Sequence, residues 1–160
     1  MNRVQRSVLV PYSDRQMFAL VRDVQRYPEF LPWCPSSQVR SLDAGPSLSD
    51  PNAPREAQQV EARVDIAYLG VRTHFTTRNT NHDPSHIELR LADGPFRSLQ
   101  GRWTFIALGA SACKVSLELE YDFSVGLLGR AIAPVFERVT NSLVDAFAAR
   151  AESLYGAAGT

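Results

Sequence analysis

The sequence predicts an α+β fold in which a curved antiparallel sheet of about six to seven strands wraps around a long C-terminal helix. Two patterns predict it. Apolar and polar residues alternate with a period of two over most of residues 59–123, which is typical of strands with one wet and one buried face. The last quarter of the chain instead carries apolar residues at i, i+3 and i+4 spacing, which is typical of an amphipathic helix. Grouped antiparallel strands with segregated helices define this fold class.

The length and charge of the chain limit its organisation. Its 160 residues predict one domain, residues 1–160, that buries roughly two thirds of its unfolded surface. Seventeen basic and seventeen acidic side chains cancel, so bulk charge argues neither for nor against nucleic acid, and we expect no DNA partner. Every basic side chain except Lys114 is an arginine. Arginine suits phosphate contacts, although a GC-rich genome produces the same bias.

The cysteines and the N-terminus point to a cellular location. Cys34 and Cys113 are too few for a disulfide scaffold, and neither has a CxxC partner. Residues 1–6 show no apolar run with a cleavage site, and no apolar run is long enough to cross a bilayer. We therefore expect a soluble, cytoplasmic protein with at most transient membrane contact.

The N-terminal third predicts short elements. Residues 4–10 alternate as a strand, which Pro11 ends. Ser13 followed by Gln16 forms a capping box, so a helix should begin there and end before Pro28. A second strand is expected near residues 37–42. Proline and turn-forming residues then dominate residues 43–58, which we expect to be a mobile surface loop without chemistry.

The alternating region predicts a series of hairpins, with turns expected at residues 69–70, 79–85, 93–95 and 109–110. Residues 113–123 form the cleanest strand pattern. The final apolar stripe runs from Leu128 to Phe147, and the main helix should extend over residues 134–155. Pro134 either opens this helix at its first turn or kinks it.

One segment is neither helix nor strand. It reads Tyr27-Pro28-Glu29-Phe30-Leu31-Pro32-Trp33-Cys34-Pro35. Its prolines exclude a regular helix and a central strand. Its aromatic residues and leucine are too apolar for an ordinary loop, so we expect it to fold onto the core, a ligand cavity or a partner.

Eight stretches spread over nearly the whole chain carry a resemblance to a known family: residues 6–13, 17–24, 27–34, 75–79, 93–103, 112–115, 134–136 and 144–147. They resemble the helix-grip superfamily of START-like and polyketide-cyclase-like domains. Within it, the chain is most similar to the RatA-type ribosome association toxin family and the related mitochondrial coenzyme Q-binding proteins. Residues 43–58 look longer and richer in proline than the family's hairpin, which leaves the shape of one cavity rim open.

The resemblance implies a helix-grip fold and two functions. Coenzyme Q-binding members hold a polyprenyl quinone and support ubiquinone biosynthesis or respiration. RatA-type members act as toxins that bind the large ribosomal subunit, block subunit association and inhibit translation. We expect non-catalytic binding of ubiquinone or another polyprenyl lipid between sheet and helix. The ribosomal toxin is the alternative, and an enzyme acting on a polyketide-like substrate is a third.

A quinone lipid needs a long apolar slot with a few polar groups. Tyr68, Trp103 and Tyr121 carry polar tips on faces that should be buried, where a ligand carbonyl could partner them. Plain core packing is the alternative for each candidate, and the Phe30–Trp33 segment is either a lid or a plug. The candidate ligand-binding residues are Phe30, Leu31, Trp33, Val64, Ile66, Tyr68, Phe75, Leu89, Trp103, Phe105, Leu117, Leu119, Tyr121, Val135, Val139 and Leu143.

Metal and catalytic sites are not expected. His82 and His86 are four residues apart, but Asp83-Pro84 between them predicts a turn and not a helical metal pair, while His74 lies on a charged face. No histidine can be placed beside Cys34, so a free buried thiol is favoured over a nucleophile. The carboxylates lie on wet faces and lack the protected pocket of a general acid. We therefore expect no catalytic residues, no metal and no cofactor besides a bound lipid.

Ribosome binding needs exposed basic side chains that face RNA. Glutamates and aspartates are interspersed among the arginines, so a solvated face of mixed charge is the alternative. The candidate arginines are Arg63, Arg72, Arg78, Arg90 and Arg102 on outward strand faces, and Arg3, Arg6, Arg15, Arg22 and Arg26 near the N-terminus.

Overall fold

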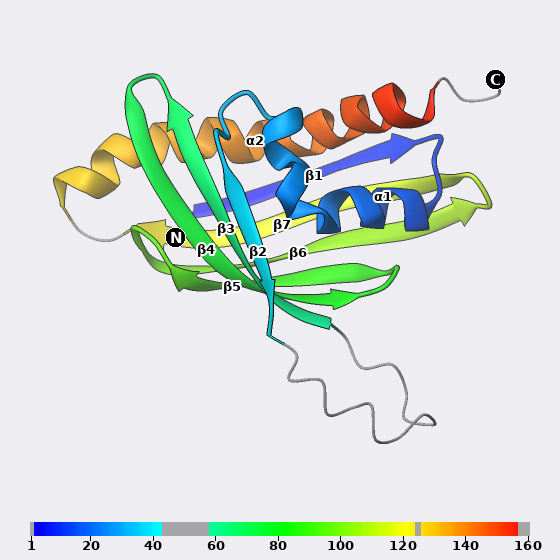
Figure 1. Cartoon of the computed structure of the whole chain (residues 1–160), viewed down its shortest axis with the longest axis horizontal. Coiled ribbons are helices and arrows are strands. Elements are labelled where there is room, and N and C mark those ends of the chain that lie inside the picture. Colours follow the sequence, from blue (N-terminus) through cyan, green and yellow to red (C-terminus); the bar gives the residue numbers. More distant parts are fainter. Residues whose placement is uncertain (1, 43–57, 124–125, 157–160) are drawn as a thin grey trace.

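The computed structural model describes residues 2–42, 58–123 and 126–156, with only the backbone of Leu127 and Leu128. One antiparallel sheet forms the body of the molecule, and a long C-terminal helix packs along it (Figure 1). The expected loop at residues 43–58 falls outside this description except for Gln58, which begins a strand.

Over the described ranges the sheet contains seven strands in the spatial order β1-β7-β6-β5-β4-β3-β2, and every neighbouring pair is antiparallel. Strands β2 to β7 follow one another as a meander, and β1 joins the edge beside β7. The predicted α+β class and the predicted number of strands are confirmed. The strands are β1 (Asn2–Val10), β2 (Ser37–Ser41), β3 (Gln58–Tyr68), β4 (Val71–His82), β5 (His86–Asp93), β6 (Phe96–Gly109) and β7 (Ala112–Phe123).

Strand β4 is longer than the sequence predicts. Residues 79–85 were expected to turn, yet the strand continues to His82 and the turn contains only residues 83–85, with a cis Asp83–Pro84 bond. Asn79 and Asn81 are buried on the inner face, opposite Leu89 and Ile87 of β5. Their polarity is typical of a turn, but cross-strand pairing keeps them in the sheet.

Gly70 and Gly101 occupy positions where the backbone favours glycine, the first in a turn and the second at a close approach of two strands. Leu69 and Gly70 have φ angles of 51° and 81°, so they form the predicted tight turn between β3 and β4 with both central residues at positive φ. At Gly101 in β6, an added Cβ would lie 2.4 Å from the Glu118 carbonyl oxygen and 2.4 Å from Leu119 Cδ2. Strands β6 and β7 therefore approach too closely there for any side chain.

The first helix, α1 (Asp14–Arg22), begins as predicted. The Gln16 N–H donates to Ser13 Oγ at 3.1 Å, and the Ser13 N–H donates to Gln16 Oε1 at 2.9 Å. A 3₁₀ helix, η1 (Val24–Glu29), then carries the chain through Pro28. The predicted capping box is confirmed, and α1 ends before Pro28 as predicted. The segment predicted to be neither helix nor strand does begin in a helix, because η1 includes residues 27–29.

The last helix, α2 (Leu127–Tyr155), begins seven residues before Pro134, so the prediction that Pro134 could open it is wrong. Proline lacks the N–H that would bond the Arg130 carbonyl, and the helix tolerates this single loss. Its apolar stripe faces the sheet, with Ile132, Val135, Phe136, Val139 and Phe147 buried. Across the described ranges, no helix combines the length and apolar character needed to cross a bilayer.

Candidate functional site

A small cavity lies between the inner face of the sheet and α2. Its volume is about 70 Å³, and its wall is mostly apolar. Pockets that hold drug-sized ligands typically measure about 300–1,000 Å³. A polyprenyl quinone therefore fits only if the side chains that line the cavity move apart.

The structure brings about half of the predicted ligand-binding residues to this cavity. Nine line it: Trp33, Val64, Phe75, Leu89, Trp103, Leu117, Leu119, Val139 and Leu143. Seven are not part of its wall: Phe30, Leu31, Ile66, Tyr68, Phe105, Tyr121 and Val135. Of the three aromatics expected to offer polar tips, only Trp103 reaches the cavity. Ligand binding by any of these residues stays a prediction.

Two of the expected polar aromatics are used elsewhere. The Tyr68 hydroxyl accepts a hydrogen bond from Arg138 Nη1 at 3.4 Å, at the surface. Tyr121 is buried and packs edge-on against Phe136, with ring centroids 4.8 Å apart. Burial raises the pKa of Tyr121, and the nearby Glu137 carboxylate adds to this effect.

Polar groups in the cavity wall come from residues that the sequence did not single out. Thr77 Oγ1 donates to Asn79 Oδ1 at 2.6 Å, and both side chains lie on the inner face of β4. Thr140 of α2 also lines the cavity and donates to the Phe136 carbonyl at 2.8 Å. The sequence does carry a signal for the inner face of β4. Thr77, Asn79 and Asn81 continue the alternation of that strand and therefore share one face. The remaining wall residues that the sequence missed are Val24, Tyr27, Ala62, Leu99, Phe136 and Phe147.

The proline-aromatic segment, residues 27–35, packs against the C-terminal end of β3. Leu31 and Trp33 are buried, and Trp33 lines the cavity. The Ala67 N–H donates to the Trp33 carbonyl at 2.8 Å, ahead of the first residue of β2. From α2, Arg150 bonds Glu29 at 2.8 Å and stacks over the Phe30 ring at 5.0 Å. Backbone and side-chain contacts therefore hold the segment on both sides.

Both cysteines are free and buried, as predicted. Burial raises the pKa of the Cys34 thiol to about 11, with a further contribution from the Asp65 carboxylate, and the thiol donates to the Ser36 carbonyl at 3.3 Å. Burial likewise raises the pKa of Cys113 to about 11. Both thiols stay protonated near neutral pH, so neither has the thiolate form that a nucleophile needs.

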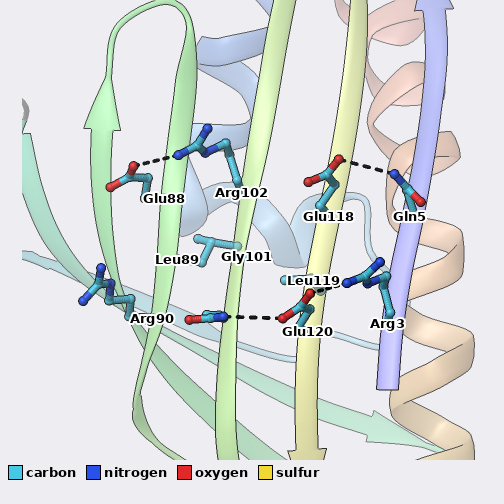
Figure 2. Close-up of a pocket in the computed structure, with 11 residues that line it drawn as sticks. Arg3, Gln5, Glu88, Leu89, Arg90, Gly101, Arg102, Glu118, Leu119 and Glu120 are labelled. Atoms are coloured by element: carbon cyan, nitrogen blue, oxygen red, sulfur yellow. Dashed lines mark hydrogen bonds and ion pairs between the residues drawn. The ribbon is translucent and has the colours of Figure 1, made fainter. Parts of the chain in front are cut away.

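The outer face of the sheet carries a polar groove of about 440 Å³ across β5, β6, β7 and β1 (Figure 2). Arg102 Nη2 pairs with Glu88 at 3.1 Å, and Arg3 Nη2 pairs with Glu120 at 2.7 Å. The pairing with Arg3 lowers the pKa of Glu120 below its ordinary range. Positive and negative side chains thus largely balance each other inside the groove.

At one edge of this groove the positive and negative side chains do not pair evenly. A row of outward side chains crosses the sheet in register: Arg40, Glu61, Arg78, Arg90, Gln100, Glu120 and Arg3. Its outer members form ion pairs. Arg78 and Arg90 in the centre are exposed and directly opposite each other, and within the described residues neither has a hydrogen-bond or ion-pair partner.

The other candidate arginines behave differently. Arg63 pairs with Asp65 at 3.1 Å, and Arg102 pairs with Glu88. The N-terminal set does not gather on one surface, because Arg3 faces the outer groove while Arg22 approaches Asp83 at 4.0 Å.

Two of the histidines lie side by side, although the turn between them was expected to keep them from forming a metal pair. His82 and His86 are cross-strand partners at the ends of β4 and β5, and their rings stack with centroids 4.1 Å apart. Glu88 approaches both rings. The short turn between the two strands brings the rings together. Helical spacing is therefore not the only way to place two histidines side by side. His74 lies apart, beside Asp93 at 3.4 Å.

Comparisons with known proteins cover nearly the whole chain. Residues 10–148 match the family described as polyketide cyclase / dehydrase and lipid transport. The ribosome association toxin RatA of Pseudomonas aeruginosa is 43% identical over 153 residues, which cover 96% of this chain and 97% of that protein. The ribosome association toxin RatA of Escherichia coli K12 is 38% identical over 157 residues, which cover 98% and 91%. A mitochondrial coenzyme Q-binding protein of Schizosaccharomyces pombe is 25% identical over 150 residues, which cover 91% and 84%.

Solved structures share the architecture. An 18 kDa protein of Caulobacter crescentus is 30% identical with a TM-score of 0.70, covering 98% of this chain and all of that one (100%). A START superfamily protein from Mycobacterium smegmatis is 21% identical with a TM-score of 0.69, covering 95% and 98%. The second likeness concerns the fold alone.

Proposed function

The chain belongs to the polyketide cyclase / dehydrase and lipid transport family, in the branch of ribosome association toxins and coenzyme Q-binding proteins, and we propose that it associates with the large ribosomal subunit and inhibits translation. The observation that carries this proposal is the identity of 43% and 38% to ribosome association toxins over nearly the full length. The likeness to the coenzyme Q-binding protein is lower, at 25%. The role is non-catalytic binding.

The structure supports a contact surface for this role. Like charges directly opposite each other on neighbouring strands destabilise a sheet, yet Arg78 and Arg90 stand in that arrangement. Among the described residues neither forms an ion pair, because Glu61, opposite Arg78 on β3, pairs with Arg40. Guanidinium groups bind phosphate oxygens in a bidentate manner. RNA phosphates would supply the missing negative charge, so we assign the ribosome-facing surface to the outer face of β4 and β5.

A second candidate is the binding of a hydrophobic ligand such as ubiquinone. Thr77, Asn79 and Thr140 favour it, because they place polar groups in the wall of an otherwise apolar cavity. The cavity volume of about 70 Å³ argues against a resident polyprenyl chain unless the wall rearranges. We therefore rank this candidate second.

Cosedimentation of the purified protein with large ribosomal subunits tests the first candidate. Phosphate contacts make binding weaken as salt rises. Replacing both arginines, as Arg78→Gln with Arg90→Gln, should weaken binding and reduce the salt slope by about 2. Arg15→Gln, an exposed arginine on α1, is the matched control and should bind like the unaltered protein. Absence of the unaltered protein from large-subunit fractions at low salt would overturn the function. Equal binding of the double variant would overturn only the assigned surface.

Organic extraction followed by mass spectrometry tests the second candidate. A quinone or other lipid released from folded protein in near-stoichiometric amount supports it. A clean extract, together with no change in the thermal unfolding midpoint when a short-chain ubiquinone is added, eliminates it.

A further inference from the structure

The β4–β5 hairpin brings three potential metal ligands together on the outer face of the sheet. His82 ends β4, His86 begins β5, and their rings stack at an interplanar angle of 12°. His82 Nε2 lies 3.8 Å from Glu88 Oε2, and His86 Nε2 lies 3.9 Å from Glu88 Oε1. All three ligand atoms lie within 4.8 Å of one another.

We propose that His82, His86 and Glu88 form a binding site for a divalent transition metal ion of the zinc class. Two imidazole nitrogens and one carboxylate oxygen are a common ligand set for Zn²⁺, with a fourth position left for water or another ligand. Ligand atoms bound tetrahedrally at about 2.0–2.2 Å lie roughly 3.4 Å apart. The two observed N–O separations, 3.8 and 3.9 Å, are close to this value. Because the lone pair of an imidazole nitrogen lies in the ring plane, the two stacked rings must also turn until both planes meet at the ion.

The hydrogen bonds around His86 determine which ring nitrogen is available. Ser85 Oγ donates its single hydrogen to the His82 carbonyl at 3.2 Å. When this hydrogen stays on the His82 carbonyl, the 2.7 Å contact between Ser85 Oγ and His86 Nδ1 is donated by the ring, from Nδ1–H. In that tautomer Nε2 carries a free lone pair and lies 3.9 Å from Glu88 Oε1. An outer hydrogen bond of this kind orients most metal-binding histidines.

His82 provides an independent observation. Its Nε2 is buried and has no hydrogen-bond partner among the residues that the structure describes. A buried polar atom without a partner is rare and calls for an explanation. A metal ion coordinated in the plane of the His82 ring would satisfy this nitrogen.

Arg102 is the neighbouring positive charge that such a site must accommodate. Its Nη2 holds Glu88 Oε1 at 3.1 Å, which leaves Oε2 on the side of His82. Arg102 also lies in register with Glu118 on β7, on its other side (Figure 2). The guanidinium can therefore turn to Glu118 when a cation binds Glu88, which limits the repulsion between the two positive charges.

Isothermal titration of the full chain with Zn²⁺, after removal of any polyhistidine tag, tests the site. We expect one ion per chain with micromolar affinity, and a visible absorption band when Co²⁺ is used instead. His82→Ala and His86→Ala should each weaken binding by about tenfold or more, and Ser85→Ala should weaken it less. Glu88→Gln, at a half-exposed position, gives a ligand variant that should fold normally.

His74→Ala is the matched control, because His74 is the third histidine of the chain and lies outside the cluster. It should bind Zn²⁺ like the unaltered protein. The proposal is overturned if the unaltered chain shows no saturable binding. It is also overturned if folded Glu88→Gln and His86→Ala bind with unchanged affinity, or if His74→Ala abolishes binding. Far-UV circular dichroism of each variant verifies the fold.

Discussion

The Ala67 N–H donates a 2.8 Å hydrogen bond to the Trp33 carbonyl, and this bond joins the proline-aromatic segment to β3. A second bond, from the Asp65 N–H to the Ser36 carbonyl at 3.0 Å, extends the connection. The segment therefore extends the edge of the sheet ahead of the first residue of β2. We therefore expect it to seal the core and not to act as a freely moving lid.

Hydrogen exchange should report this seal. We expect the amides of Asp65 and Ala67 to be protected about as strongly as those in the centre of β3, because exchange requires the segment to detach. Native-state exchange followed by NMR measures this. Rapid exchange at Asp65 and Ala67, with the β3–β4 amides still protected, would instead indicate a lid that opens.

Truncation of Trp33 should lower stability strongly. Trp33 is only 7% exposed and contacts the cavity, so Trp33→Ala should reduce the free energy of unfolding by about 3–5 kcal/mol. Tyr68→Ala is the comparison, because Tyr68 is half-buried and lies outside the cavity wall; its effect should be about 1 kcal/mol. Urea unfolding at equilibrium measures both, and equal losses would contradict the placement of Trp33.

A side chain at position 101 should disrupt the pairing of β6 and β7. Gly101→Ala places a Cβ 2.4 Å from the Glu118 carbonyl oxygen, which cannot rotate away as a side chain can. We expect a loss of about 1–3 kcal/mol or more. Gln100→Ala, at the exposed neighbouring position, should change stability by less than about 0.5 kcal/mol. A neutral Gly101→Ala in thermal unfolding would show that the two strands can separate locally.

Asp65 should contribute a pH-dependent part of the stability. Burial acts to raise its pKa, but hydrogen bonds from Ser36 and Arg63 outweigh burial and lower it below the ordinary 3.8. A lowered folded-state pKa stabilises the protein above the unfolded pKa, and this contribution is lost as pH falls through the folded value. Asp65→Asn should therefore reduce stability near pH 7, by less than about 1 kcal/mol, and have little effect in strong acid. Urea unfolding at both pH values measures the difference, and an equal effect at both would refute this assignment.

Arg90 should be unfavourable for folding although favourable for the proposed ribosome binding. Arg90→Glu places a carboxylate opposite Arg78 and should raise stability by about 0.2–1 kcal/mol at low salt. The same variant should bind large ribosomal subunits more weakly. Arg102→Glu is the counterpart, since it faces Glu88 and Glu118 and should lose stability. Thermal unfolding measures the change in stability of both variants. Stabilisation by Arg102→Glu would contradict the proposed repulsion between Arg78 and Arg90 as the cause.

Much of the architecture follows from local patterns. Alternation in residues 113–123 predicted β7 and its buried face, and Ser13 with Gln16 predicted the start of α1. The pattern failed where polar residues face inward. Asn79 and Asn81 indicate a turn by their type, and only pairing with β5 keeps them in β4.

The candidate sites were harder to predict. Sequence alternation identified which residues point inward, so Trp103 and Leu119 were correctly assigned to the inner face. Which inward residues border a cavity depends on how side chains from β3, β4, β6 and α2 pack together. Tyr68 and Tyr121 were expected at the cavity and lie outside its wall for this reason.

By itself, the sequence determined the fold class, the order of the strands along the chain, the face on which most strand side chains lie and the family. These properties depend on periodicity and on short motifs, which act over a few residues. Only the tertiary structure decided the cavity volume, the opposition of Arg78 and Arg90 and the stacking of His82 on His86. The physical reason is register. Alternation assigns a residue to a face, but hydrogen bonding between strands and close packing against α2 determine which residue becomes its neighbour.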